Sequence, residues 1–273
     1  MMIVDGEYNS FRISTPTGFE DVFSHFYYAA NHTSEMVTKT LLPSYQTILI
    51  FTFGVKAFLV SEEGYEIEGG NCLVLGPVKR AFDYVLPPGA EILVVNFVGD
   101  AFYRFFGKTS VAEHVPMNPD VLLFENCFTD LWFRMNTMRD VNQRVNCILE
   151  FCRPYLKERN SVVNQLIGFK DDEKNVVKVV ADANDQTERN IQLLHKKHLG
   201  YSAKELSRYN RFLKAVGLIQ MLVTANAKID WIEVVNTCGY YDQSQLIRDF
   251  KHYIHLSPNQ YLKFQKDICN PKT

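Results

Sequence analysis

The sequence predicts an α+β protein, in which a small antiparallel β-barrel or sandwich with trailing helices precedes an all-α C-terminal domain. Residues 43–98 hold short apolar segments at roughly ten-residue spacing, separated by Gly, Pro, Asn or Glu. From residue 161 onward the apolar residues instead recur every three or four positions, which is the period of amphipathic helices. A chain of 273 residues is long enough for two such domains.

The six predicted strands are rich in Val, Ile, Leu, Phe and Tyr. They cover residues 43–53, 56–61, 64–69, 71–77, 81–87 and 90–98. Turn residues follow each of them without an intervening helical segment, and this favours an antiparallel barrel or sandwich over βαβ units.

Helices are predicted to follow the strands. Residues 100–107 predict one capped helical turn, and residues 120–159 have helical periodicity that Pro154 would kink or end. This second segment is a candidate dimer surface, because Trp132 and Met residues are expected to be exposed on it, or it packs against the barrel.

The C-terminal region predicts seven helices, and five residues are expected to cap their starts. The helices are expected over 161–168, 173–183, 186–198, 203–225, 230–238, 242–254 and 258–266, and the caps at Asp185, Ser202, Asp230, Asp242 and Ser257. We therefore predict a β-rich domain over residues 1–160 and a helical domain over 161–273, with a hinge near 155–162.

The helical region is internally doubled. The segment DQTERNIQLLHKKHLGYSAKELSRY resembles DQSQLIRDFKHYIHLSPNQYLKF, and a short apolar segment precedes each. This alignment pairs Asp185-Gln186 with Asp242-Gln243, Ile191 with Leu246 or Ile247, and Ser202 with Ser257. Helix, short turn and second helix form the helix-turn-helix pattern. The 203–225 helix would span roughly 34 Å, about one turn of B-DNA.

Composition and charge limit the class of protein. No apolar run is long enough to cross a membrane, and no secretion signal is seen. The six cysteines form no C-x-x-C pair, so we expect free thiols in a cytoplasmic protein, with Cys147 and Cys152 as the pair to consider for a thiol sensor. Residues 1–160 carry 13 basic and 19 acidic side chains and residues 161–273 carry 16 and 12. The basic C-terminal part suggests a polyanionic partner.

Residues 239–262 resemble the second helix-turn-helix of AraC/XylS-family transcription regulators. The resemblance rests on Gly239, Tyr240, Asp242, Gln243, Ser244, Leu246, Arg248, Phe250, Lys251, Ser257, Pro258 and Tyr261. The first copy matches at Thr187, Arg189, Ile191, Gly200, Ser202, Lys204, Arg211 and Phe212, so the resemblance covers about 165–265. It implies a double helix-turn-helix that binds double-stranded DNA in the cytoplasm, at the nucleoid. It also implies a cupin-like N-terminal domain that senses a small molecule or forms a homodimer, with RNA polymerase as a further partner.

The residues expected to contact DNA lie on two helices. They are Arg189, Gln192, Leu193, Lys196 and Lys197 on the first, and Gln243, Ser244, Gln245, Arg248 and Lys251 on the second. Gln pairs with adenine, Arg pairs with guanine, and Leu193 suits a thymine methyl group. Ile191 and Leu194 are expected to be buried on the first helix, and Leu246 and Phe250 on the second.

The chain departs from the family pattern at five positions. Leu193 replaces a DNA-facing Arg, His195 a core aromatic residue, Val235 a small Ala, His255 a left-handed Gly, and Leu262 an Arg. An alternative is therefore an interaction domain that has lost DNA binding, fused to a β-barrel enzyme that is metal-dependent or of another type. Residues 43–98 contain no His, and the sequence has no nucleophile-elbow or phosphate-loop glycine pattern. We therefore predict no catalytic, metal or cofactor site.

Overall fold

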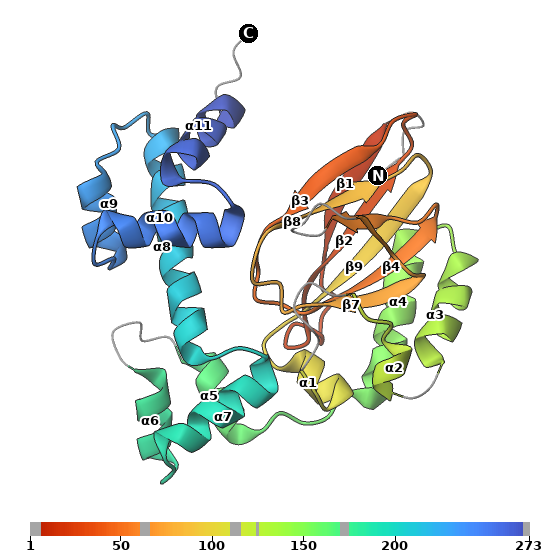
Figure 1. The fold of residues 1–273 in the computed structure, drawn as a ribbon. Helices are drawn as coiled ribbons and strands as arrows, with labels where there is room; N and C mark the ends of the chain where they lie inside the picture. The colour runs from red at the N-terminus through yellow and green to blue at the C-terminus, as the bar shows by residue number, and fades with distance from the viewer. Residues whose placement is uncertain (1–6, 61–65, 110–115, 124–125, 170–174, 270–273) are drawn as a thin grey trace. The chain divides into compact units, whose positions relative to one another are not determined.

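The computed structural model describes residues 7–60, 66–109, 116–123, 126–169 and 175–269. The chain forms two compact units, Met1–Tyr201 and Ser202–Thr273. The first contains antiparallel sheets with helices, and the second is helical (Figure 1), so the predicted α+β class is confirmed. No helix of the described residues is long and apolar enough to cross a membrane.

Two antiparallel sheets form the β-rich part of the first unit. The larger has the order β1 (Tyr8–Ser14), β2 (Phe23–Asn31), β9 (Ala90–Phe97), β4 (Ile48–Gly54) and β7 (Cys72–Leu75). The smaller has the order β3 (Val37–Leu41), β8 (Phe82–Leu86), β5 (Phe58–Val60) and β6 (Glu66–Glu68). The described parts of all six predicted strand segments contain strands. The end of the second predicted segment and the start of the third fall in 61–65, outside the described residues.

Three strands at the N-terminus were not predicted. Strands β1 and β2 pair with each other, and β2 also pairs with β9, so they complete one side of the larger sheet. Strand β3 pairs only with β8 among the described strands. The segment FSHFYYAAN of β2 is rich in aromatic residues, which are typical of strands. This composition was the feature of the sequence from which β2 could have been predicted.

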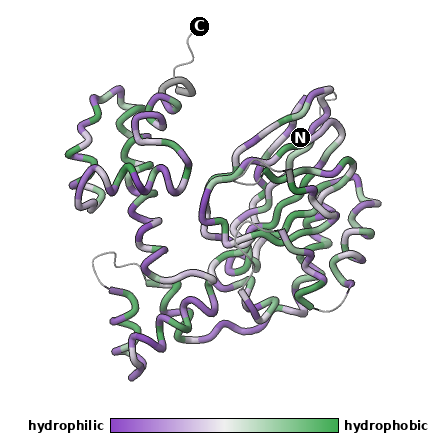
Figure 2. Tube along the Cα trace, in the orientation of Figure 1, coloured by the Kyte–Doolittle hydropathy of each residue, from purple (hydrophilic) through white to green (hydrophobic). Residues whose placement is uncertain are grey.

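Both faces of the larger sheet are buried. Ile48, Ile50, Ile92 and Val94 pack between the sheets, and the residues that alternate with them point to the opposite face, because strand side chains alternate with a period of two. Figure 2 shows this sheet largely in hydrophobic colours. Burial on both faces explains why β4 and β9 are almost continuously apolar.

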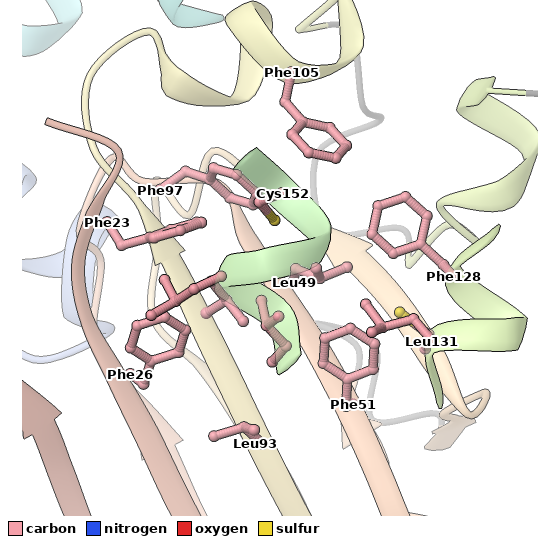
Figure 3. Close-up of a cluster of buried hydrophobic side chains, with 14 of the residues drawn as sticks. Phe23, Phe26, Leu49, Phe51, Leu93, Phe97, Phe105, Phe128, Leu131 and Cys152 are labelled. Carbon is pink, nitrogen blue, oxygen red and sulfur yellow. The ribbon is translucent and has the colours of Figure 1, made fainter. Parts of the chain in front are cut away.

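Helices cover the second face of the larger sheet. These are α1 (Ala101–Phe106), α2 (Asp120–Leu123), α3 (Cys127–Asn136) and α4 (Val141–Cys152), followed by the 3-10 turn η1 (Arg153–Tyr155). Figure 3 shows Phe128 and Leu131 of α3 and Cys152 of α4 beside strand residues such as Phe51 and Phe97. The described part of the 120–159 segment is thus several helices. Pro154 was predicted to kink or end the helix, and α4 ends at Cys152, two residues before it.

Trp132 is half-buried, which corrects the expectation that it is exposed on a dimer surface. Its indole Nε1 donates a hydrogen bond of 2.7 Å to the Thr52 carbonyl, and its ring stacks on Phe53. The bond ties α3 to β4, which favours the alternative that this segment packs on the sheets.

Replacement of Trp132 with Phe is expected to lower the free energy of unfolding by about 1 kcal/mol, because the Thr52 carbonyl loses its donor while most apolar contact stays. Urea denaturation of the full chain measures this. The neighbouring exposed Phe133 gives the control, since Phe133→Leu should change little. Equal losses in the two variants would contradict the role of the indole bond.

Three further helices belong to the first unit. Helices α5 (Ser161–Gly168), α6 (Val176–Ala183) and α7 (Glu188–Leu199) pack together, and α7 also contacts α1. The predicted bounds of α5 are confirmed, whereas residues 173–174 of the predicted second helix lie outside the described residues. These helices lie in the same compact unit as the sheets. The predicted domain boundary near residue 160 is a division by function, and it therefore stays a prediction.

The second unit is built on α8 (Ala203–Thr224), against which α9 (Trp231–Cys238), α10 (Gln243–Ile254) and α11 (Pro258–Cys269) pack. Phe212 of α8 lies at its centre, with ring centroids 5.0 Å from Phe250 and 4.7 Å from Tyr253. Tyr261 of α11 closes this core and accepts a hydrogen bond of 3.0 Å from Gln220. The predicted helices of this unit are confirmed.

Candidate nucleic-acid interface

The two helix pairs α6–α7 and α9–α10 have the same dimensions. Each consists of a helix of 8 residues and a helix of 12 residues. The connections, residues 184–187 and 239–242, have equal length. Each longer helix ends in a left-handed residue, Gly200 with φ 80° or His255 with φ 59°. The duplication that the sequence indicates is therefore present in the fold of each pair.

The buried positions of the two longer helices also agree. The fourth, eighth and eleventh residues are buried in both: Ile191, His195 and His198 of α7, and Leu246, Phe250 and Tyr253 of α10. This register pairs Ile191 with Leu246 rather than Ile247. The remaining arc of each helix is left at the surface, where recognition helices carry their reading residues.

The start of α7 corrects the predicted alignment. Thr187, not Asp185, caps α7, since its hydroxyl accepts from the Asn190 amide at 3.3 Å. Asp185 instead adopts a positive φ of 50° in the connection. Asp185-Gln186 is therefore not the counterpart of Asp242-Gln243, because Asp242 is the N-cap of α10 as predicted.

Serine caps follow both pairs, as predicted. Ser202 and Glu205 form a reciprocal capping box at the start of α8. Ser257 and Gln260 make the same two contacts at α11, of 2.7 and 3.3 Å. The pairing of Ser202 with Ser257 is therefore confirmed, and the predicted cap Asp230 is also confirmed, since its carboxylate accepts from the Ile232 amide.

The candidate residues of α7 are all exposed: Arg189, Gln192, Leu193, Lys196 and Lys197. Leu193 leaves 60% of its surface in contact with solvent. Leu194 was expected to be buried but is only half-buried, because the inner arc of α7 is centred on Ile191 and His195.

Four of the five candidate residues of α10 are exposed, namely Gln243, Ser244, Arg248 and Lys251. Gln245 is the exception. Its side-chain oxygen accepts from the Tyr241 amide at 3.0 Å, and its own amide donates to Asp242 at 2.7 Å. These bonds form a capping arrangement at the helix start, so Gln245 is held at the N-terminus of α10.

Sequence reasoning missed the residue that anchors α10. Asp249 is 1% exposed and accepts from Arg208 at 2.7 Å and from Arg211 at 3.4 Å, both on α8. The Arg211 guanidinium lies 4.7 Å from the Tyr240 ring centroid. Burial, followed by the Asp249 carboxylate, raises the pKa of Tyr240 above its usual value. The buried position of Asp249 could have been predicted from the sequence, because a charged residue stands there between the buried Leu246 and Phe250.

Two histidines fix the C-terminal half of α7. The His195 ring Nδ1 lies 2.8 Å from the Tyr201 carbonyl, and the His198 ring lies 3.9 Å from the Tyr103 ring of α1. Burial lowers the pKa of His198, and this outweighs the opposite effect of the Asp100 carboxylate. His198 is therefore mainly neutral near pH 7. These contacts hold the first candidate reading helix within the Met1–Tyr201 unit.

His255 adopts the left-handed conformation expected of it, and its amide donates to the Lys251 carbonyl at 3.2 Å. A residue other than Gly in this conformation costs roughly 1 kcal/mol.

The exposed side of α7 borders a cavity of about 620 Å³ within the first unit. It is lined by Pro77, Lys79, Tyr103, Gly107, Lys108, Thr109, Leu193, Lys196, Lys197 and Gly200. Three of the candidate DNA-contact residues are among these, whereas Arg189 and Gln192 are not. Among the described residues, no group of three His, Cys, Asp or Glu side chains is placed to hold a metal ion.

Comparison with known proteins gave matches among solved structures. No family model and no curated protein matches the chain. ToxT from Vibrio cholerae aligns over 95% of this chain and 98% of its own, at 12% identity and a TM-score of 0.41. The AraC-like transcriptional activator CuxR aligns over 76% and 86%, at 10% identity and a TM-score of 0.27. At TM-scores this low, the alignments define neither the fold nor the activity of this chain.

Proposed function

We propose that the protein is a sequence-specific DNA-binding transcription regulator of the AraC/XylS type. In this proposal α6–α7 and α9–α10 are two helix-turn-helix units, and α7 and α10 enter major grooves of double-stranded DNA. The observation that carries it is the equality of the two pairs in helix length, connection length and buried register. Two copies of one reading unit are what a protein needs to contact two neighbouring segments of a duplex.

The proposed contacts of α10 follow from its exposed arc. Gln243 and Arg248 carry the amide and guanidinium groups that read adenine and guanine edges, and Ser244 suits either base. Lys251 suits a phosphate. Gln245 is assigned to the helix start instead, because its side chain caps α10.

The proposed contacts of α7 are weaker at the equivalent places. In the shared register Leu193 occupies the position of Arg248, and Lys196 occupies that of Lys251. Leu193 offers only an apolar contact to a thymine methyl group, whereas Arg248 offers two donors to guanine. Arg189 and Gln192 add polar contacts, and Lys197 adds a charge. Selectivity is therefore proposed to come mainly from α10.

The remaining parts of the proposal concern regulation. The β-rich part would sense a small molecule, and the protein would act as a cytoplasmic, nucleoid-bound homodimer that contacts RNA polymerase. The outer side of α2–α4 is the proposed dimer surface, because Val121 and Phe133 are each 59% exposed there and exposed apolar side chains favour a partner. No catalytic activity is proposed.

Selection of genomic DNA fragments by the purified full chain tests the function. Recovery of a shared sequence element, with binding that weakens steeply as salt rises, is expected. Recovery of no enriched sequence, at any salt concentration that keeps the chain folded, would contradict it.

Replacement of Arg248 with Ala is expected to weaken binding to the selected site by about 1–3 kcal/mol and to relax selectivity at one base pair. A gel-shift titration with single-base variants of the site measures both effects. Arg139→Ala is the matched control, since Arg139 is exposed and lies on no candidate reading helix. Loss of affinity without any change in base preference would place Arg248 on a phosphate instead.

A further inference from the structure

Two consecutive tyrosines in the connection between α9 and α10 lie in opposite environments. Tyr240 is buried, and its ring centroid lies 4.7 Å from the Arg211 guanidinium. Tyr241 instead has 93% of its surface exposed, the highest value among the large apolar and aromatic side chains that the structure describes. An aromatic ring stabilises a fold through the surface that it buries. Tyr241 therefore contributes little to the stability of its unit.

The position of Tyr241 makes its exposure informative. Tyr241 directly precedes Asp242, the N-cap of α10, and an apolar side chain at this place often packs against the fourth residue of the helix. In α10 that residue is Leu246, which is fully buried. A ring that is 93% exposed does not make such a contact. The fold therefore does not use the Tyr241 ring to define the start of α10.

The backbone on both sides of this ring is held by hydrogen bonds. The Tyr241 amide donates to Gln245 Oε1 at 3.0 Å, and the Gln245 amide donates to Asp242 Oδ1 at 2.7 Å. One residue earlier, the Tyr240 amide donates to the Val235 carbonyl at 2.9 Å. The Tyr241 side chain thus extends from a fixed backbone, so a partner that binds it needs to order only its two side-chain torsion angles.

The first helix pair has a side chain of related chemistry at the same place. Gln186 directly precedes Thr187, the N-cap of α7, and is also exposed. The fourth residue of that helix is Ile191, which is fully buried like Leu246. Gln and Tyr are both neutral donors that bond to phosphate oxygens in protein–DNA interfaces. The two pairs therefore share an exposed neutral donor immediately before the reading helix.

We propose that the Tyr241 hydroxyl donates a hydrogen bond to a backbone phosphate of the bound DNA; this contact rests on the proposed function. In a helix-turn-helix the first helix crosses the DNA backbone, and the N-terminal residues of the second helix reach the bases. The connection between them therefore passes from the backbone to the groove, and the residue before the N-cap lies on the backbone side. The contact adds affinity and fixes α10 in the groove, so that Gln243 and Arg248 face their bases, but it reads no base itself.

Tyr241→Phe tests the contact in the full chain, because it removes only the hydroxyl. A gel-shift titration on the selected site is expected to show an affinity lowered on the order of tenfold, since the acceptor is charged. The base preference should stay the same, and so should the salt dependence, because a neutral donor releases no counterion. Tyr155→Phe is the matched control, since Tyr155 is 41% exposed and lies on neither helix pair. Thermal unfolding should be unchanged by Tyr241→Phe, because the ring lies outside the core.

Neutral methylphosphonate linkages, placed one at a time along the selected site, identify the acceptor. At one linkage the unchanged chain is expected to lose affinity while Tyr241→Phe loses much less, because both changes remove the same hydrogen bond. At every other linkage the two proteins should be weakened equally. Equal weakening at all linkages would show that the hydroxyl bonds to no phosphate.

The other outcomes separate this contact from the proposed function. Equal affinity of Tyr241→Phe and the unchanged chain for the selected site would remove Tyr241 from the interface and leave the proposed function in place. A change in base preference would place the hydroxyl on a base edge instead, and an equal loss in Tyr155→Phe would show that the loss is not specific to Tyr241. If the folded, unchanged chain selects no DNA sequence, the proposed function and this contact are both wrong.

Discussion

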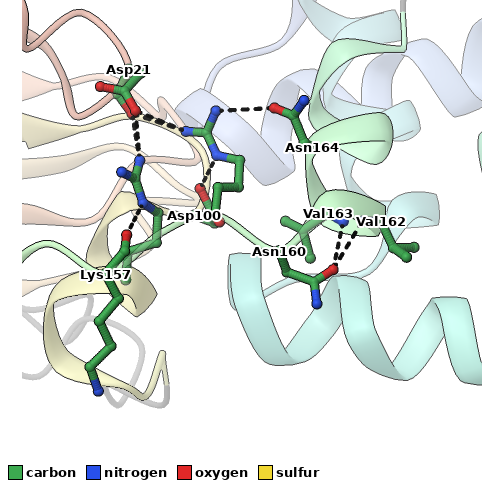
Figure 4. Close-up of polar contacts among 9 residues, drawn as sticks. Asp21, Asp100, Lys157, Asn160, Val162, Val163 and Asn164 are labelled. Carbon is green, nitrogen blue, oxygen red and sulfur yellow. Dashed lines mark hydrogen bonds and ion pairs between the residues drawn. The ribbon is translucent and has the colours of Figure 1, made fainter.

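Replacement of Arg159 with Met should lower the free energy of unfolding of the Met1–Tyr201 unit by about 3 kcal/mol. Asp100 is completely buried, and Arg159 Nε lies 2.8 Å from its Oδ1 atom (Figure 4), while Oδ2 has no hydrogen-bond partner in the described part of the chain. Removal of the guanidinium leaves a buried carboxylate without its cation. The Arg159 side chain also donates to the Asp21 carbonyl at 3.0 Å. Its replacement therefore removes a contact with the loop that holds Asp21 as well. Urea denaturation of the full chain measures the change.

A second variant distinguishes the ion pair from simple packing. Asp100→Asn removes the charge at nearly constant volume, so the double variant Arg159→Met/Asp100→Asn should recover a large part of the lost stability. Arg139→Met, at an exposed position, controls for the general effect of the substitution. A loss in Arg159→Met that the double variant does not reduce would show that the charge of Asp100 is not the cause.

Replacement of Asp249 with Asn should destabilise the Ser202–Thr273 unit by about 2 kcal/mol. Removing one partner of a buried ion pair typically costs about 3–5 kcal/mol, but the Arg208 side chain is 40% exposed, so water replaces part of what it loses. Arg211 is affected more, because its side chain is 26% exposed and its Nε atom is already buried without a hydrogen-bond partner among the residues that the structure describes. Thermal and urea unfolding of the full chain, followed in the transition of this unit, give the value.

The same change should alter DNA binding through the position of α10. Asp249 holds α10 to α8 but lies on the buried arc, so Asp249→Asn should weaken binding without changing which base is preferred. Glu233→Gln is the control, because Glu233 is exposed in the same unit and loses the same charge. A stability loss no larger than that of Glu233→Gln would remove Asp249 from its anchoring role.

The helical half of the fold could be predicted largely from local signals. The bounds of α5 and the starts of α8 and α10 follow from cap residues and three- to four-residue apolar spacing, which act within a few positions along the chain. The β-rich half could be predicted only in part. Strand β2 pairs with β9, about seventy residues later in the chain, and local pattern carries little information about such non-local pairing.

The candidate site likewise has features that could be predicted from local sequence and features that depend on contacts between distant segments. The exposed arc of α10 could be predicted because Leu246 and Phe250 define the opposite side of the helix. The roles of Gln245 and Asp249 could not, because they depend on a cap contact and on arginines of α8. The lysine-lined cavity depends on three segments that approach one another only in the folded unit, so no pattern in any one of them reveals it.

The division of the chain after Tyr201 passes through the doubled region. The two helix pairs therefore have the same helix lengths and buried register but pack against different neighbours. The pair α6–α7 packs in the unit that contains the sheets, whereas α9–α10 packs on α8 and α11. A perturbation of the β-rich part reaches the first copy through direct packing, while the second copy depends on a core of its own. In the proposed regulator, the first helix pair would thus be the one that an effector adjusts, and the second the one that stays constant.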